Sequence, residues 1–231
     1  MLRTKLLGAL LALAQPVLAQ GDPRVMIQGF IWEANSQGAR QAKQSVPDNW
    51  YAQVRSNVPH LVQGKFDLIW LPPPSQGNDT GYYPTQYFSL RSSYGGEKEQ
   101  RLLLAALLRQ GIEPVADLVL NHRNGTTRWA DFTNPNWDTT AIARGDEFWS
   151  ASDLQNPADR RDQDAKNWGH PDTGMNNEGA RDLDHRQPQV RRDLKKYLHM
   201  LHQAGYRGWR YDQVKGYAPE FVAEYNRSSR P

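Results

Sequence analysis

Short apolar runs alternate with stretches of helical periodicity, and this alternation constrains the fold more than any other feature of the chain. The apolar runs suit buried strands and lie at residues 25–30, 66–71 and 115–120. Between them, residues 48–62 and 97–110 carry apolar side chains at helical spacing, and Pro59 is expected to kink the first helix. Strand, helix, strand, helix, strand predicts parallel strands joined by right-handed crossovers.

The alternation breaks off once and then resumes. Residues 121–184 are rich in Asn, Asp, Gly, Pro and Arg and show no sustained period, which predicts a functional insertion rather than an idle loop. A helix at 190–202, a strand at 206–211 and a helix after Pro219 follow. Four strand-helix units with an insertion after the third strand predict an α/β fold, half of an eight-unit (β/α)8 TIM barrel. The expected boundaries are 20–122 for the first barrel part, 123–185 for the inserted subdomain and 186–231 for the continuation.

Residues 1–19 are expected to be a secretory signal peptide. Arg3 and Lys5 precede the apolar run 6–13, and small side chains at Val17 and Ala19 suit cleavage after Ala19. A membrane anchor or a first helix is the alternative, but the apolar run is too short to span a bilayer. Because the chain has no cysteine, an exported protein would rely on core packing or a bound metal instead of disulfides.

Composition narrows the possible partners. The 28 Lys and Arg are scattered among 25 Asp and Glu without a long basic block, so charge does not indicate a nucleic-acid partner. The eight Trp and ten Tyr could stack on sugar faces, although core packing accounts for most such rings. We expect a monomer without a nucleic-acid or membrane partner.

In a barrel of this kind, the residues at the carboxyl ends of the strands form the active face. Asp212 follows Arg210 by two residues, so both side chains point to the same face of the strand. Arg210 would then keep Asp212 ionised and orient it. An ordinary buried ion pair is the alternative interpretation.

Five segments in order resemble the alpha-amylase family of glycoside hydrolases, particularly its plant-like and related bacterial members. They are Gln28-Gly29-Phe30-Ile31-Trp32-Glu33, Trp70-Leu71-Pro72-Pro73-Pro74-Ser75, Gly81-Tyr82-Tyr83-Pro84, Asp117-Leu118-Val119-Leu120-Asn121-His122 and Gly208-Trp209-Arg210-Tyr211-Asp212. The resemblance runs from about Val25 to the end of the chain. It implies a retaining hydrolase of α-1,4-glucosidic bonds in starch-like glucans, with Asp212 as the nucleophile, and the predicted signal peptide implies that this enzyme is secreted.

The resemblance also implies roles around the nucleophile. His122 would hydrogen-bond the sugar at the cleavage site, and Tyr82 would stack against it, although either could be a core residue. Lys215 and Tyr217 would contact sugars on the leaving-group side, with a solvated loop lysine as the competing interpretation. Asp117 matches a supporting residue and is not expected to be catalytic.

A calcium ion is implied by the inserted subdomain. The expected oxygen ligands come from side chains and from backbone carbonyls; they are Asn121, Asp172 and Asp182, with the carbonyls of Met175 and Gly216. Solvated loop acids are the alternative. Asn176 stands where family members with further calcium ions have an aspartate, so further sites are not supported.

The acid/base glutamate of the family pattern follows the fifth strand, beyond Pro231. Glu220 and Glu224 fall on the expected helix after the fourth strand and are not substitutes. The sequence therefore predicts an N-terminal part that lacks the general acid. Alternatives are an exo-acting maltooligosaccharide-forming amylase or transglycosylase, a non-catalytic glucan-binding product, and a truncated product that does not fold stably.

Overall fold

Four parallel strands form the central sheet of the computed structural model, which describes residues 23–35, 49–78, 80–144, 157–158, 160, 167–175 and 180–229. The strand order is β1 (Met26–Gln28), β2 (Leu68–Leu71), β5 (Glu113–Val119) and β8 (Gly208–Asp212). All three neighbouring pairs are parallel, as the alternation predicts. The sheet is open, with β1 and β8 at its edges, and has the strand order of the first half of a (β/α)8 barrel. The predicted signal peptide lies outside the described residues.

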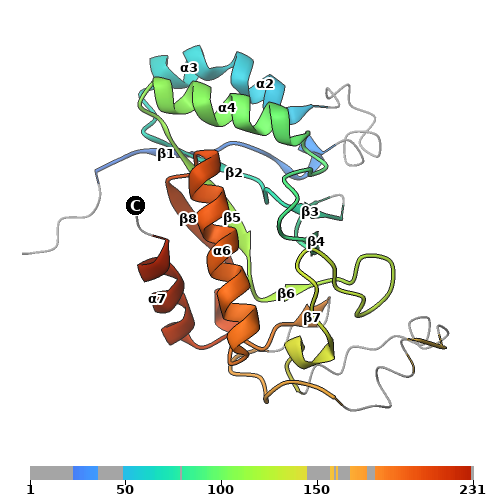
Figure 1. Ribbon diagram of the computed structural model, residues 1–231. Helices are drawn as coiled ribbons and strands as arrows, with labels where there is room; N and C mark the ends of the chain where they lie inside the picture. The colour runs from blue at the N-terminus through green and yellow to red at the C-terminus, as the bar shows by residue number, and fades with distance from the viewer. Residues whose placement is uncertain are drawn as a thin grey trace, which may run out of the picture.

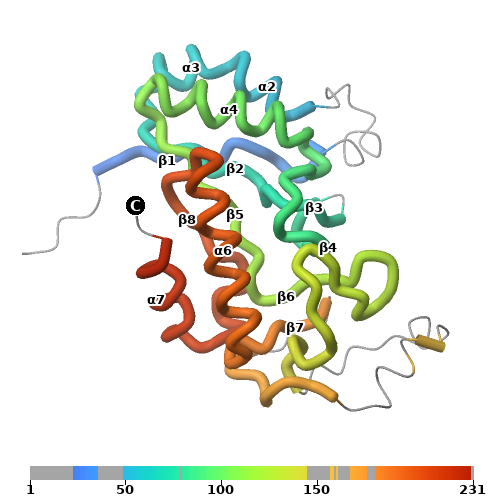
Figure 2. The backbone as a smooth tube through the Cα atoms, in the orientation of Figure 1, coloured from blue at the N-terminus to red at the C-terminus, as the bar shows by residue number. Residues whose placement is uncertain are grey.

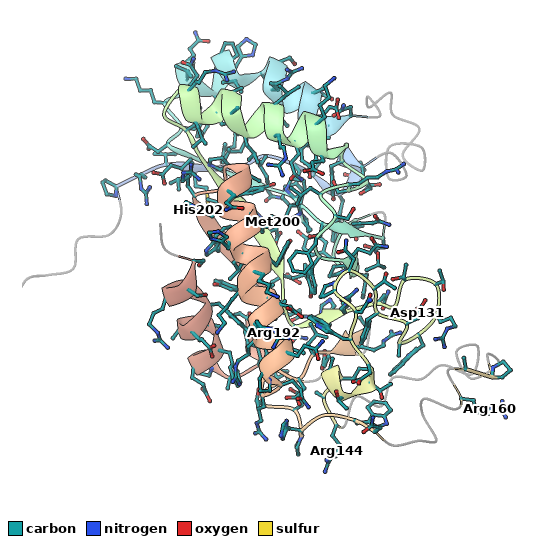
Figure 3. The ribbon with its side chains drawn as sticks, viewed as in Figure 1. Asp131, Arg144, Arg160, Arg192, Met200 and His202 are labelled. Atoms are coloured by element: carbon teal, nitrogen blue, oxygen red, sulfur yellow. The ribbon has the colours of Figure 1, made fainter. Side chains whose placement is uncertain are left out.

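Helices connect the strands and cover the sheet from the outside. Helices α2 (Trp50–Ser56), α3 (Val58–Gln63) and α4 (Glu97–Arg109) lie together, while α6 (Pro188–Ala204) runs along β5 and β8 beside α7 (Pro219–Ser228) (Figures 1 and 2). Arg192, Met200 and His202 mark the course of α6 (Figure 3). Within the described part of the chain, no helix combines the length and the apolar character needed to cross a membrane.

The first predicted helix is interrupted earlier than expected. Instead of a kink at Pro59, the chain breaks at Asn57, whose side-chain amide donates to the carbonyl of Gln53 over 2.9 Å. Pro59 then sits in the first turn of α3, where its missing N–H leaves no helical hydrogen bond unmade.

The core lies between the helices and the sheet. The apolar faces of the two long crossover helices are almost completely buried; their residues are Leu103, Leu104 and Leu107 of α4 and Val190, Leu194, Tyr197, Leu198 and Leu201 of α6. Burying one such aliphatic side chain contributes about 1.5–3 kcal/mol. After α4, Gly111 turns the chain at φ +74°, a conformation that favours glycine.

Short antiparallel strand pairs and single helical turns follow the carboxyl ends of the sheet strands. Strand β3 (Gln76–Gly77) pairs with β4 (Pro84–Gln86), and β6 (His122–Arg123) pairs with β7 (Arg181–Asp182). The turns are η1 (Trp32–Ala34), η2 (Thr139–Ala141) and η4 (Val214–Gly216). Because β6 and β7 pair, the chain leaves and re-enters the sheet region at one place. Among the described residues between them, Asp131, Arg144 and Arg160 lie away from the sheet (Figure 3).

Candidate active site

Two carboxylates share one arginine at the carboxyl ends of β5 and β8. The register of these strands places Asp117 beside Arg210. Arg210 Nη1 donates to Asp117 Oδ1 over 2.8 Å and to Asp212 Oδ1 over 2.6 Å. Asp117 is completely buried, whereas 19% of the Asp212 side chain is exposed. Asp117 therefore fixes the position of Arg210, and Arg210 in turn holds the more accessible carboxylate of Asp212.

Asp117 is the centre of this arrangement. Its Oδ2 accepts hydrogen bonds from Tyr82 Oη over 2.7 Å and from Trp70 Nε1 over 3.1 Å. Burial raises the pKa of the Asp117 carboxyl, and the hydrogen bonds from Arg210 and Tyr82 act in the opposite direction. The Arg210 guanidinium also lies 4.9 Å from the centre of the Trp70 ring. Trp70 of β2 and Arg210 of β8, the strands on either side of β5, thus hold the Asp117 carboxylate together with Tyr82.

Tyr82 lies above Asp117 on the loop between β3 and β4. Burial and then the charge of Asp117 raise the pKa of the Tyr82 hydroxyl far above 10, so it stays protonated as a donor. Its ring meets the Trp32 ring edge to face, with centroids 5.4 Å apart, and 61% of Trp32 is exposed. The sequence suggests a sugar-stacking role for Tyr82 only, yet Trp32 offers the larger open aromatic surface.

His122 lies next to the Tyr82 loop, and both of its ring nitrogens contact other protein atoms. Its Nε2 lies 2.9 Å from the carbonyl oxygen of Tyr82, and its Nδ1 lies 3.3 Å from the side-chain nitrogen of Asn121. Burial lowers the pKa of His122, which favours the neutral ring with one N–H. That N–H donates to the Tyr82 carbonyl, so His122 holds the Tyr82 loop, and the predicted sugar bond would have to displace this contact.

The two residues predicted on the leaving-group side differ in exposure. Lys215 is exposed on η4, directly after β8. Tyr217 is only 2% exposed and stacks on His185, with ring centroids 4.1 Å apart and planes at 18°. Its ring is thus almost fully buried, and the predicted sugar contact stays a prediction.

Asn121 contacts two of the other predicted calcium ligands, Asp182 and Gly216. Asn121 Nδ2 donates to Asp182 Oδ1 over 2.8 Å, and Asn121 Oδ1 and Asp172 Oδ2 are buried oxygens without a hydrogen-bond partner. A Cβ atom added to Gly216 would lie 1.9 Å from Asn121 Oδ1, so the Gly216 backbone packs directly against this amide. Met175 lies on the segment that contacts η4.

These residues fit a hard cation that takes oxygen ligands. Two buried oxygens without partners are unfavourable unless something binds them. The set contains two carboxylates, an amide and backbone carbonyls, which are the donors that calcium prefers. Across the described ranges, no group of three or more His, Cys, Asp or Glu side chains is suited to a metal, so the carbonyls would have to complete the shell.

Asp184 has a role that the sequence did not suggest. It is 3% exposed; its Oδ2 accepts from the backbone N–H of His170 over 2.7 Å, and its Oδ1 accepts from that of Arg186 over 2.9 Å. Asp184 thus fastens the segment that carries Asp172 to the start of α6. An aspartate in a polar run gives no sign of such distant partners, whereas the position of Trp32 at the end of β1 could have marked it as a surface aromatic of the active face.

The chain has relatives among known proteins. A family profile described as alpha amylase, catalytic domain, matches residues 38–229. The chain is 30% identical over 215 residues to alpha-amylase 3, chloroplastic, of Arabidopsis thaliana, covering 90% of this chain and 21% of that protein. It is 26% identical over 223 residues to a glucan 1,4-alpha-maltotetraohydrolase of Stutzerimonas stutzeri, covering 90% of this chain and 36% of that protein. The chain spans less than half the length of these relatives.

Comparison with solved structures finds the fold of this chain in alpha-amylases. Alpha-amylase I from Eisenia fetida superposes with a TM-score of 0.64 at 17% identity, over 90% of this chain and 41% of that one. An alpha-amylase from Malbranchea cinnamomea superposes with a TM-score of 0.63 at 16% identity, over 89% of this chain and 45% of that one.

Proposed function

The chain belongs to the alpha-amylase family, and from this premise we propose that it supplies the nucleophile for hydrolysis of α-1,4-glucosidic bonds of starch-like glucans with retention of configuration. Asp212 is the nucleophile in this proposal. The observation that supports it most is the position of Asp212 at the carboxyl end of β8, part exposed and held by Arg210 over 2.6 Å. The test is hydrolysis of maltoheptaose by the complete enzyme and its loss in the Asp212→Asn variant.

The reaction has two steps in this proposal. A carboxylate oxygen of Asp212 attacks the anomeric carbon while an acid protonates the departing glycosidic oxygen, and water then cleaves the covalent glycosyl ester. Arg210 keeps the nucleophile charged and aimed. Asp117 cannot supply the proton, because it is completely buried beneath Tyr82. The family resemblance assigns the acid to a glutamate that follows the fifth strand of the barrel.

Substrate binding rests on the aromatic and charged side chains around Asp212. We assign Tyr82 and Trp32 to the faces of the sugar rings, since their edge-to-face pair leaves Trp32 largely open. Lys215 would contact the leaving-group side. His122 would act by holding the Tyr82 loop, and Tyr217 by packing beneath η4.

Calcium is the proposed structural ion of this site. Asn121, Asp172 and Asp182 would hold it with the carbonyls of Met175 and Gly216, so that the ion ties the insertion to η4. When bound, it would supply positive charge to buried oxygens and fix the loops that carry them. It would take no part in bond cleavage.

Removal of calcium is expected to lower the melting temperature of the wild-type chain. A ligand that binds only the native state stabilises that state by about 2.7 kcal/mol when the free ligand concentration is a hundred times the dissociation constant. The measurement is thermal unfolding with excess calcium and with chelator. The response should vanish in Asp172→Asn and persist in Asp138→Asn, which alters an exposed insertion carboxylate that caps η2. An unchanged wild-type midpoint would rule out the calcium site.

Secretion is also part of the proposal, on the basis of residues 1–19. Recovery of the protein outside the cell with Gln20 as its first residue, by N-terminal sequencing, would agree with it; an intact Met1 would not.

A second function is glucan binding without hydrolysis. In the part of the chain that the structure describes, the carboxyl group that shares Arg210 with Asp212 is that of Asp117, which is completely buried and cannot protonate a leaving group. A chain that binds maltoheptaose but releases no product would favour this alternative.

A further inference from the structure

Two loops from distant parts of the sequence are joined beside the candidate nucleophile. One is the segment 173–175 of the insertion, and the other is the segment 214–218 that follows β8. The backbone N–H of Ala218 donates to Thr173 Oγ1 over 3.1 Å, and the N–H of Met175 donates to the carbonyl of Lys215 over 3.0 Å. The insertion therefore holds η4 from both sides of Gly216.

Between these two bonds the backbones touch. A Cβ atom added to Gly174 would lie 2.4 Å from the carbonyl carbon of Gly216 and 2.5 Å from the nitrogen of Tyr217. Both neighbours are backbone atoms and cannot rotate away, so only glycine fits at 174. The close approach and the two hydrogen bonds are made by the chain itself, without an ion.

The Thr173 hydroxyl accepts a backbone N–H at the start of helix α7. The Ala218 N–H lies at the start of this helix, where no side chain of the helix provides a cap. Thr173 supplies the acceptor from another part of the chain, which is the role of a capping side chain. Removal of the hydroxyl leaves this N–H without its partner.

The segment that is held in this way begins at the nucleophile. Gln213, directly after Asp212, has φ +44°, a conformation uncommon for a residue with a side chain. The next turn, η4, presents Lys215 and Val214 to solvent. An open hollow of about 590 Å³ adjoins them, and its lining includes Thr173, Lys215 and Pro219. A strained bend with exposed side chains needs an external support to keep one geometry.

We propose that the segment 173–175 is a clip that positions Lys215 for the leaving-group end of the glucan, with Thr173 as a positioning residue. This inference rests on the proposed function, because it takes Lys215 as a sugar contact. It adds that the grip of Lys215 on the substrate depends on a hydroxyl of the insertion.

The test compares Thr173→Val with Thr173→Ser in the full chain. Valine keeps the shape and removes the hydroxyl, whereas serine keeps the hydroxyl. Loss of one hydrogen bond predicts maltoheptaose binding about threefold to tenfold weaker in Thr173→Val, by isothermal titration calorimetry, and unchanged within about twofold in Thr173→Ser. Thr139→Val is the matched control, since it removes a threonine hydrogen bond elsewhere in the insertion, and it should bind as the wild type does.

A double-mutant cycle separates positioning from general damage. In the Lys215→Ala background, Thr173→Val should cause little further loss, because the hydroxyl acts through Lys215. Equal loss in both backgrounds, or wild-type binding by Thr173→Val, would overturn the proposal. If the valine variant does not fold, Thr173→Ala replaces it in the same cycle.

Amide hydrogen exchange tests the clip without any sugar. The amide of Ala218 should exchange faster in Thr173→Val than in the wild type and Thr173→Ser, and equal exchange would contradict the clip. A wild-type chain that binds no maltoheptaose would defeat the proposed function, while the exchange data would still decide whether the clip exists.

Discussion

Replacing Asp212 by asparagine in the complete enzyme is expected to lower the rate of maltoheptaose hydrolysis by at least about a thousandfold, since an amide cannot form the glycosyl ester. Binding of maltoheptaose should change only a few fold, because the amide keeps the shape of the carboxylate that it replaces. The measurement is product release followed by chromatography, with proton NMR of the first product to test retention of the α-anomer. A variant that hydrolyses as fast as the wild type would remove Asp212 from the mechanism.

Asp67→Asn is the matched control for this experiment. Asp67 directly precedes β2, so it lies at the amino end of the sheet, where its carboxylate accepts the N–H of Val25 over 2.7 Å. Residues at that end of a barrel contribute to stability rather than to chemistry. This variant should therefore retain the wild-type rate. If both variants lose activity alike, the loss reflects folding and not the nucleophile.

The two inner strands of the sheet were predictable because they read as apolar runs, and β5 is buried along nearly its whole length. Residues 66–71 and 115–120 appear as β2 and β5 with shifts of at most two residues, and their parallel pairing follows from the crossovers. The break at Asn57 was not predictable in the same way. It depends on a side-chain hydrogen bond that competes with the helix, whereas the sequence drew attention to Pro59.

The candidate site was predictable where neighbouring residues share a strand, and less so where the chain folds back. Arg210 and Asp212 were expected on one face from the two-residue period alone, and they meet there. The burial of Tyr217 depends on His185, which is distant in the sequence, and the role of His122 depends on the Tyr82 carbonyl. Such contacts arise from tertiary packing, which a local pattern does not encode.

Arg123 presents the largest expected effect on stability, although no sequence pattern indicates a role for it. It is completely buried, and its guanidinium donates to the carbonyls of Thr85, Thr133 and Pro135. The rings of Tyr87, Phe132 and Trp137 surround it, with centroids 4.8–5.3 Å from its central carbon. Burial lowers the pKa of Arg123 to about 10, so the side chain remains charged at neutral pH. One cation therefore ties the base of the insertion to β4.

The Arg123→Met variant is expected to lose about 3–5 kcal/mol of unfolding free energy, because three partly buried carbonyls lose their charged donor together. The melting temperature should fall on the order of 10 °C, measured by calorimetry or circular dichroism. Arg123→Lys should recover only part of the loss, since an ammonium group cannot reach three carbonyls as the planar guanidinium does. Arg101→Met, which removes an exposed ion pair with Glu97, is the control and should change the stability by less than about 1 kcal/mol. Equal melting of the Arg123→Met and Arg101→Met variants would show that the aromatic rings and not the cation hold the insertion, since methionine can still fill the space among them.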